Sequence, residues 1–140
     1  MSFHEKSAWV MALALLFGGV FYFAVVASTS SGLGQLAAPG LPLIVVLTIA
    51  LTILSIVGQV IIAVVAPRDA NTKPDEREWK IFHRAGYLAW YASVVGTILS
   101  LGLYLLTQDG NLLFYCVFAS LVISQLLEYG VQIALYRTGV

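Results

Sequence analysis

Glu128 is the one carboxyl group within the long apolar segments of this sequence. Gln125 lies three residues before it and Gln132 four residues after it, so a helix would place the three side chains on one face. Arg137 follows nine residues after Glu128, which corresponds to about 13 Å along a helix axis. If Arg137 marks a membrane interface, Glu128 lies near the bilayer midplane, where ionisable groups are costly and often functional.

Two interpretations of Glu128 follow from this depth. In the first it is a proton or cation site, because loss of water disfavours the charged form of a carboxyl group. In the second it is a protonated group that joins helices by hydrogen bonds worth about 0.6 kcal/mol each. Both need polar partners from other segments, for which Gln59 and Thr97 are the candidates. The candidate site therefore comprises Glu128, Gln59, Gln125, Gln132 and Thr97.

No pattern typical of an enzyme or a cofactor site occurs in the sequence. His4 and His83 fall at the edges of apolar segments, too shallow to ligate a haem between facing helices. The single cysteine, Cys116, cannot form an internal disulfide. Zinc-ligand spacings and glycine-rich phosphate loops are also missing. We expect a protein with no enzymatic activity, no cofactor and no metal.

Four apolar segments carry these residues, and each is long enough to cross a bilayer. The chain has 140 residues, of which 60% are hydrophobic and 10% charged, against about 25% charged in soluble domains. A membrane-spanning helix needs about 20 apolar residues. We expect an all-α membrane protein with four antiparallel transmembrane helices in a single domain, residues 1–140, embedded in the lipid bilayer. The predicted spans are 8–27, 41–66, 85–107 and 112–136, with a loop at 28–40 and a connector at 67–84.

The basic residues indicate how these spans are oriented. All seven Lys and Arg precede the first span, lie between the second and third, or follow the fourth. By the positive-inside rule, both termini and the connector face the cytoplasm. The net charge of zero gives no indication of a nucleic-acid partner. The seven residues are Lys6, Arg68, Lys73, Arg77, Lys80, Arg84 and Arg137.

The connector carries most of the charge and leads into the third span. Thr72 followed by Asp75 fits a helix-capping pattern, and acidic residues suit a helix N-terminus. This charged stretch is either a solvated helix face or a docking surface for a cytoplasmic protein at residues 67–84. The docking candidates are Asp75, Glu76, Arg77, Glu78, Lys80 and Arg84.

The run Asp75-Glu76-Arg77-Glu78, with Ile81 three positions later, resembles a D-E-R-[DE]-x-x-I stretch. This stretch precedes a membrane helix in small bacterial integral membrane proteins whose activity is uncharacterised. The resemblance implies a bacterial inner membrane and no established activity. The sequence departs from that pattern at Trp79 and in the Gln/Glu face of the fourth span.

Small residues and an internal alignment predict how the spans associate. Small residues four apart favour close helix contact, and they recur in the third span (Ala92, Gly96, Ser100) and in the first (Ala14, Gly18). An ungapped alignment of the second and fourth spans suggests a 2+2 helix repeat about an axis along the membrane normal. It superimposes Ser55, Gln59 and Arg68 on Ser124, Glu128 and Arg137.

Three functions remain compatible with these features. The leading hypothesis is a non-enzymatic inner-membrane protein that acts through association, as an accessory subunit or a membrane sensor. The second is a proton-coupled small transporter or channel, formed by a homo-oligomer, that uses Glu128. The third is a subunit of a larger membrane redox or pigment complex.

Overall fold

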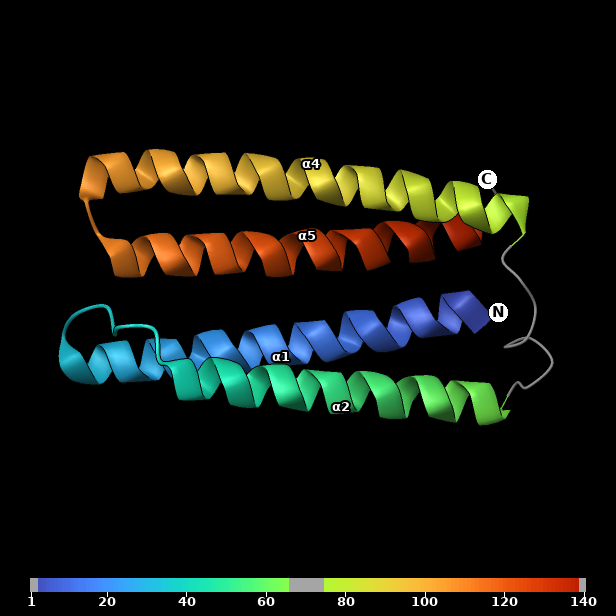
Figure 1. Ribbon diagram of the computed structural model, residues 1–140, viewed down its shortest axis with the longest axis horizontal. Coiled ribbons are helices and arrows are strands. Elements are labelled where there is room, and N and C mark those ends of the chain that lie inside the picture. Colours follow the sequence, from blue (N-terminus) through green and yellow to red (C-terminus); the bar gives the residue numbers. More distant parts are fainter. Residues whose placement is uncertain (1–2, 66–74, 139–140) are drawn as a thin grey trace.

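The computed structural model describes residues 3–65 and 75–138, which form helices and contain no strand. The helices are α1 (Phe3–Leu33), α2 (Leu41–Val65), α4 (Glu76–Thr107) and α5 (Gly110–Thr138), as Figure 1 shows. Each of the four is long and apolar enough to cross a membrane. The prediction of an all-α protein with four candidate membrane helices is confirmed. Residues 67–74 of the connector lie outside the described residues, and with them Arg68, Thr72 and Lys73.

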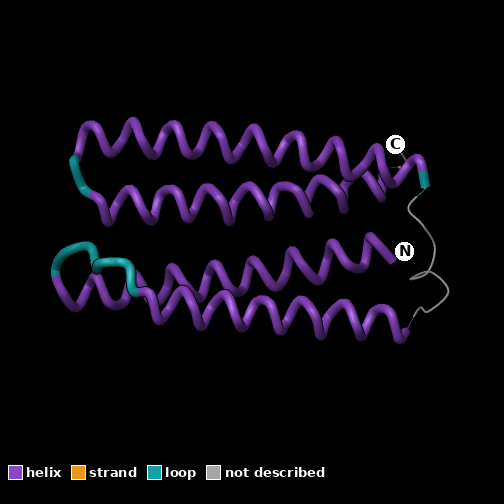
Figure 2. Tube along the Cα trace, viewed as in Figure 1, coloured by secondary structure: helices purple, strands orange, loops and turns teal. Residues whose placement is uncertain are grey.

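The helices lie side by side in the order α4, α5, α1, α2 (Figures 1 and 2). Helix α5 packs against both α4 and α1, and α1 packs against α2. The two described ends of the chain lie at the same end of the molecule (Figure 1). The spans that the repeat would make equivalent have different surroundings, because α5 lies inside the row and α2 at its edge. The 2+2 repeat stays a prediction.

Helix α1 continues past the point where the sequence suggested a loop. The polar run that begins at Ser28 was expected to be loop, but the helix ends at Leu33. Three hydroxyl groups explain the difference, because those of Ser28 and Thr29 donate to the carbonyl of Val25 and that of Ser31 to the carbonyl of Ser28. Such bonds satisfy the hydroxyl groups within the helix. Gly34, at φ +66°, then ends it.

Capping residues fix the start of α4 and the short turn between α4 and α5. The Asp75 carboxylate accepts from the backbone N–H of Glu76, and Glu78 accepts from the N–H of Asp75, which forms a capping box. Gln108, in the left-handed region at φ 54°, ends α4. The next residue, Asp109, accepts from two backbone N–H groups at the start of α5.

Small residues bring the helices close together, as their spacing predicted. A Cβ at Gly96 would lie 2.5 Å from the Cβ of Ser120, so α4 and α5 nearly touch there. Ser100, one turn further on, is buried in the same contact region. On the other side of the row, a Cβ at Gly18 would lie 2.8 Å from Leu51 of α2. The close contacts predicted at Gly18 and Gly96 therefore occur.

An aromatic core closes the end of the molecule opposite the chain termini. It is built on Tyr22, Leu47 and Tyr115, which are all buried. The Tyr115 hydroxyl donates to the carbonyl of Ala37 at 2.9 Å, and the N–H of Ala37 donates to Ser30. The loop between α1 and α2 is thereby fastened to α5, which holds three helices in register.

Candidate functional site

The carboxyl group of Glu128 accepts hydrogen bonds from both glutamines of its own helix. Nε2 of Gln125 lies 3.2 Å from Oε2, and Nε2 of Gln132 lies 3.4 Å from Oε1. The group is half-buried and reaches toward α4, where a Cβ at Gly86 would lie 3.9 Å from Oε1. A Cβ at this position would make an ordinary van der Waals contact with the carboxyl group. The structure thus brings these three predicted site residues together.

The other two predicted site residues do not reach Glu128. Gln59 of α2 donates to the hydroxyl of Ser7 in α1 at 2.6 Å. Thr97 donates to the carbonyl of Ser93 within α4. Gln59 does not reach Glu128 because α1 lies between α2 and α5. Thr97 does not reach it because the carboxyl group meets α4 at Gly86, and Thr97 lies eleven residues, or about 16 Å of helix, beyond that point.

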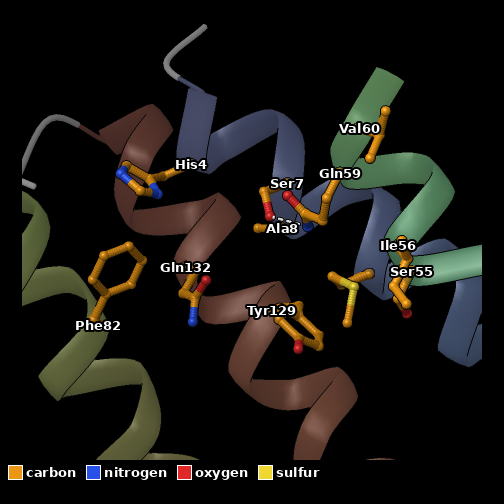
Figure 3. A pocket seen from close by; sticks show the side chains of 11 residues that line it. His4, Ser7, Ala8, Ser55, Ile56, Gln59, Val60, Phe82, Tyr129 and Gln132 are labelled. Atoms are coloured by element: carbon orange, nitrogen blue, oxygen red, sulfur yellow. Dashed lines mark hydrogen bonds between the residues drawn. The ribbon is translucent and has the colours of Figure 1, made fainter. Parts of the chain in front are cut away.

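A cavity of about 560 Å³ opens at the end of the molecule that carries the chain termini (Figure 3). All four helices contribute to it, and its surface is mostly apolar, with polar side chains at six of the lining positions. Gln132 is 6% exposed and lines this cavity while it also donates to Glu128, so a single side chain joins the cavity to the carboxyl group. The polar lining residues are His4, Ser7, Ser55, Gln59, Tyr129 and Gln132.

Two contacts between ionisable side chains connect the helices around this cavity. Nε2 of His4 lies 3.7 Å from Oε2 of Glu78, which joins α1 to α4. Nε of Arg137 lies 3.9 Å from Oε1 of Glu5, and Cζ of Arg137 lies 5.4 Å from the centroid of the Trp9 ring. Both contacts join α5 to α1. Glu5 is buried. These contacts were not predicted, because no spacing within one segment indicates which segments become neighbours.

A second hollow, the intramembrane groove, adjoins the cavity and has a volume of about 510 Å³. Residues of α1, α2 and α5 line it. It shares four of them with the cavity: Met11, Ser55, Ile56 and Tyr129. Its other polar residues are Thr48 and Thr52 of α2 and Gln125 of α5, all exposed. The two threonines donate to carbonyl groups of their own helix.

The amide of Gln125, which lines the groove, is only partly satisfied. One of its N–H groups donates to Glu128. Within residues 3–65 and 75–138, its carbonyl oxygen accepts no hydrogen bond and its amide makes no other. An amide needs several partners to satisfy all its polar atoms.

The charged start of α4 presents most of the predicted docking residues outward. Asp75, Glu76, Arg77, Lys80 and Arg84 are exposed, whereas Glu78 is half-buried against His4. Trp79 stacks on His83 with the ring centroids 5.7 Å apart. The exposed charges form one accessible surface next to the cavity.

No group of three His, Cys, Asp or Glu side chains able to hold a metal ion occurs in the part of the chain that the structure describes. No family model, curated protein or solved structure matches this chain.

Proposed function

We propose that the protein is a non-enzymatic inner-membrane protein that acts by associating with another membrane segment, as an accessory subunit or a membrane sensor. The observation that carries this proposal is the exposed amide of Gln125 in the intramembrane groove. Hydrocarbon offers no hydrogen bonds, so a polar group that faces lipid remains unsatisfied at a cost of several kcal/mol. A partner segment seated in the groove would satisfy it.

The positions of the basic residues and the connector support the rest of this assignment. With all Lys and Arg on one side, the four antiparallel spans have both termini in the cytoplasm. The exposed charges of residues 75–84 would then face the cytoplasm, beside the cavity. They would let a cytoplasmic protein respond to whatever occupies the groove. The resemblance of this stretch to small bacterial membrane proteins favours a bacterial inner membrane.

Site-specific photo-crosslinking in native membranes tests the association. A photoreactive residue at Gln125, in the groove, is compared with one at Ile123, which is exposed on the same helix and lines a different hollow, between α1 and α5. We expect adducts from position 125 and none from 123. Equal yields from the two positions, or no adduct from 125, would refute an interaction through the groove.

A second function, proton-coupled transport, is favoured by the connection between the cavity and Glu128. Gln132 lines the cavity and binds the carboxyl group, so a proton entering from the cytoplasm needs to pass only one buried side chain. This function predicts that Glu128→Gln preserves the fold and abolishes proton-coupled flux in liposomes. Unchanged flux in Glu128→Gln would exclude Glu128 as the coupling site.

A further inference from the structure

We propose that the segment that occupies the intramembrane groove is a second copy of this chain, paired about a two-fold axis along the membrane normal. This inference rests on the proposed function and names its partner. It follows from three properties of the groove: its depth, the chemistry of the Gln125 amide and the apolar residues around it.

The depth of the groove limits which residues can meet across such a pair. All copies insert in the same orientation, because the same basic residues direct each of them. A closed pair of copies is then related by a two-fold axis along the membrane normal, and each residue of the interface meets residues at its own depth. Gln125, twelve residues before Arg137, lies about 18 Å from the inner interface and therefore near the midplane.

The Gln125 amide is complementary to itself. Its bond to Glu128 uses one N–H, which leaves one N–H donor and the carbonyl acceptor. Two such amides that face each other across a two-fold axis donate to each other reciprocally, so both are satisfied without any other residue type. An unrelated partner would have to supply a donor and an acceptor at this same depth.

Apolar side chains surround the amide and extend the contact. Leu121 of α5 and Ile56 of α2 line the groove, and their side chains are 48% and 58% exposed. Thr52 of α2 also lines the groove, and its oxygen retains an acceptor site after its bond to the carbonyl of Thr48. Pairing of two grooves buries these side chains together with the amides. Helices in membranes associate through this combination of close packing and interhelical hydrogen bonds.

Cysteine crosslinking of the purified protein in liposomes tests the two-fold axis. In a Cys116→Ser background, Gln125→Cys is compared with Ile123→Cys, which is 61% exposed on the same helix and differs from it in depth by about 3 Å. A residue beside a two-fold axis meets itself, so we expect a covalent dimer from Gln125→Cys and none from Ile123→Cys. Equal dimer yields from the two variants would overturn the inference.

A second measurement changes one side chain at a time and leaves the other side chains of the groove as they are. Energy transfer between labelled copies, diluted stepwise with lipid, gives the dissociation constant of the pair. Loss of the reciprocal amide bonds in Gln125→Leu should raise this constant about tenfold. The control Ile123→Leu should leave it unchanged. A Gln125→Leu constant equal to that of the unaltered protein would overturn the inference.

These results separate the two proposals. If the purified protein does not pair in liposomes and the photoreactive group at 125 captures only chains of other mass in native membranes, the second-copy inference is overturned and the proposed function stands. If position 125 captures nothing in native membranes, both are refuted. An adduct with the mass of two chains supports both.

Discussion

Gly96→Ala probes the close contact between α4 and α5. The added Cβ would lie 2.5 Å from the Cβ of Ser120 and 3.6 Å from its Cα. A distance of 2.5 Å is too short for two Cβ atoms, and the Cβ of Ser120 is bonded directly to the backbone of α5. The two helices would therefore have to move apart. Gly102 in the same helix is the matched control, since nothing lies within 4 Å of a Cβ built there.

The magnitude follows from two opposing effects. Replacement of glycine by alanine in a helix stabilises it by about 0.5–1 kcal/mol, and this gain applies to both positions. Overpacking at Gly96 costs about 1–3 kcal/mol. The free energy of unfolding of Gly96→Ala should therefore fall about 1–3 kcal/mol below that of Gly102→Ala. Titration with a denaturing detergent in mixed micelles measures both values.

A compensating change sharpens the test. Ser120→Gly removes the Cβ that the new methyl group meets and leaves the Cα at 3.6 Å, an ordinary contact distance. The double variant should be more stable than the sum of the single effects predicts, with a coupling free energy of about 1–3 kcal/mol. Equal stabilities of Gly96→Ala and Gly102→Ala, or a coupling energy of zero, would show that α4 and α5 do not approach each other as described.

Four further substitutions, at three places in the structure, have expected outcomes that measurements of stability and amide exchange can check. Gly34→Ala should destabilise the protein by about 1 kcal/mol, because alanine disfavours the left-handed backbone at φ +66°; an unchanged stability would contradict this conformation. Asp75→Ala should remove the cap of α4, cost about 1 kcal/mol and speed amide exchange in its first turn, whereas unaltered exchange would exclude the capping box. Gln59→Leu should cost about 0.6 kcal/mol and Ser7→Ala a similar amount, and the two losses should not add, since they break one bond; additive losses would mean that the two side chains do not interact.

The sequence predicts the helices better than it predicts their neighbours. Long apolar runs bounded by polar residues indicate four membrane helices, and small residues at Gly18 and Gly96 mark faces that pack closely. The end of α1 was misplaced because Ser28 and Ser31 can satisfy their hydroxyl groups within a helix as well as in a loop. The order of the helices could not be predicted, because lipid is as apolar as the protein interior and leaves no polar face to orient them.

The candidate site likewise has contacts within one helix, which the sequence predicts, and contacts between helices, which it does not. Gln125, Glu128 and Gln132 could be predicted together, since helical spacing within one segment fixes their relative positions. Gln59 was expected beside Glu128 but bonds to Ser7, because its partner depends on which helix lies next to α2. Contacts between segments, unlike those within one, need the tertiary arrangement.

The depths assigned to Gln125 and Glu128 depend on one claim: that four spans cross the membrane with both termini and the connector in the cytoplasm. Thiol labelling in spheroplasts tests it most directly, with single cysteines at two exposed positions in a Cys116→Ser background. We predict that a membrane-impermeant reagent labels Ala38→Cys, in the α1–α2 loop, in intact spheroplasts. It should label Glu76→Cys, at the start of α4, only after the membrane is permeabilised. Labelling of both positions in intact spheroplasts, or of Glu76→Cys alone, would contradict the claim.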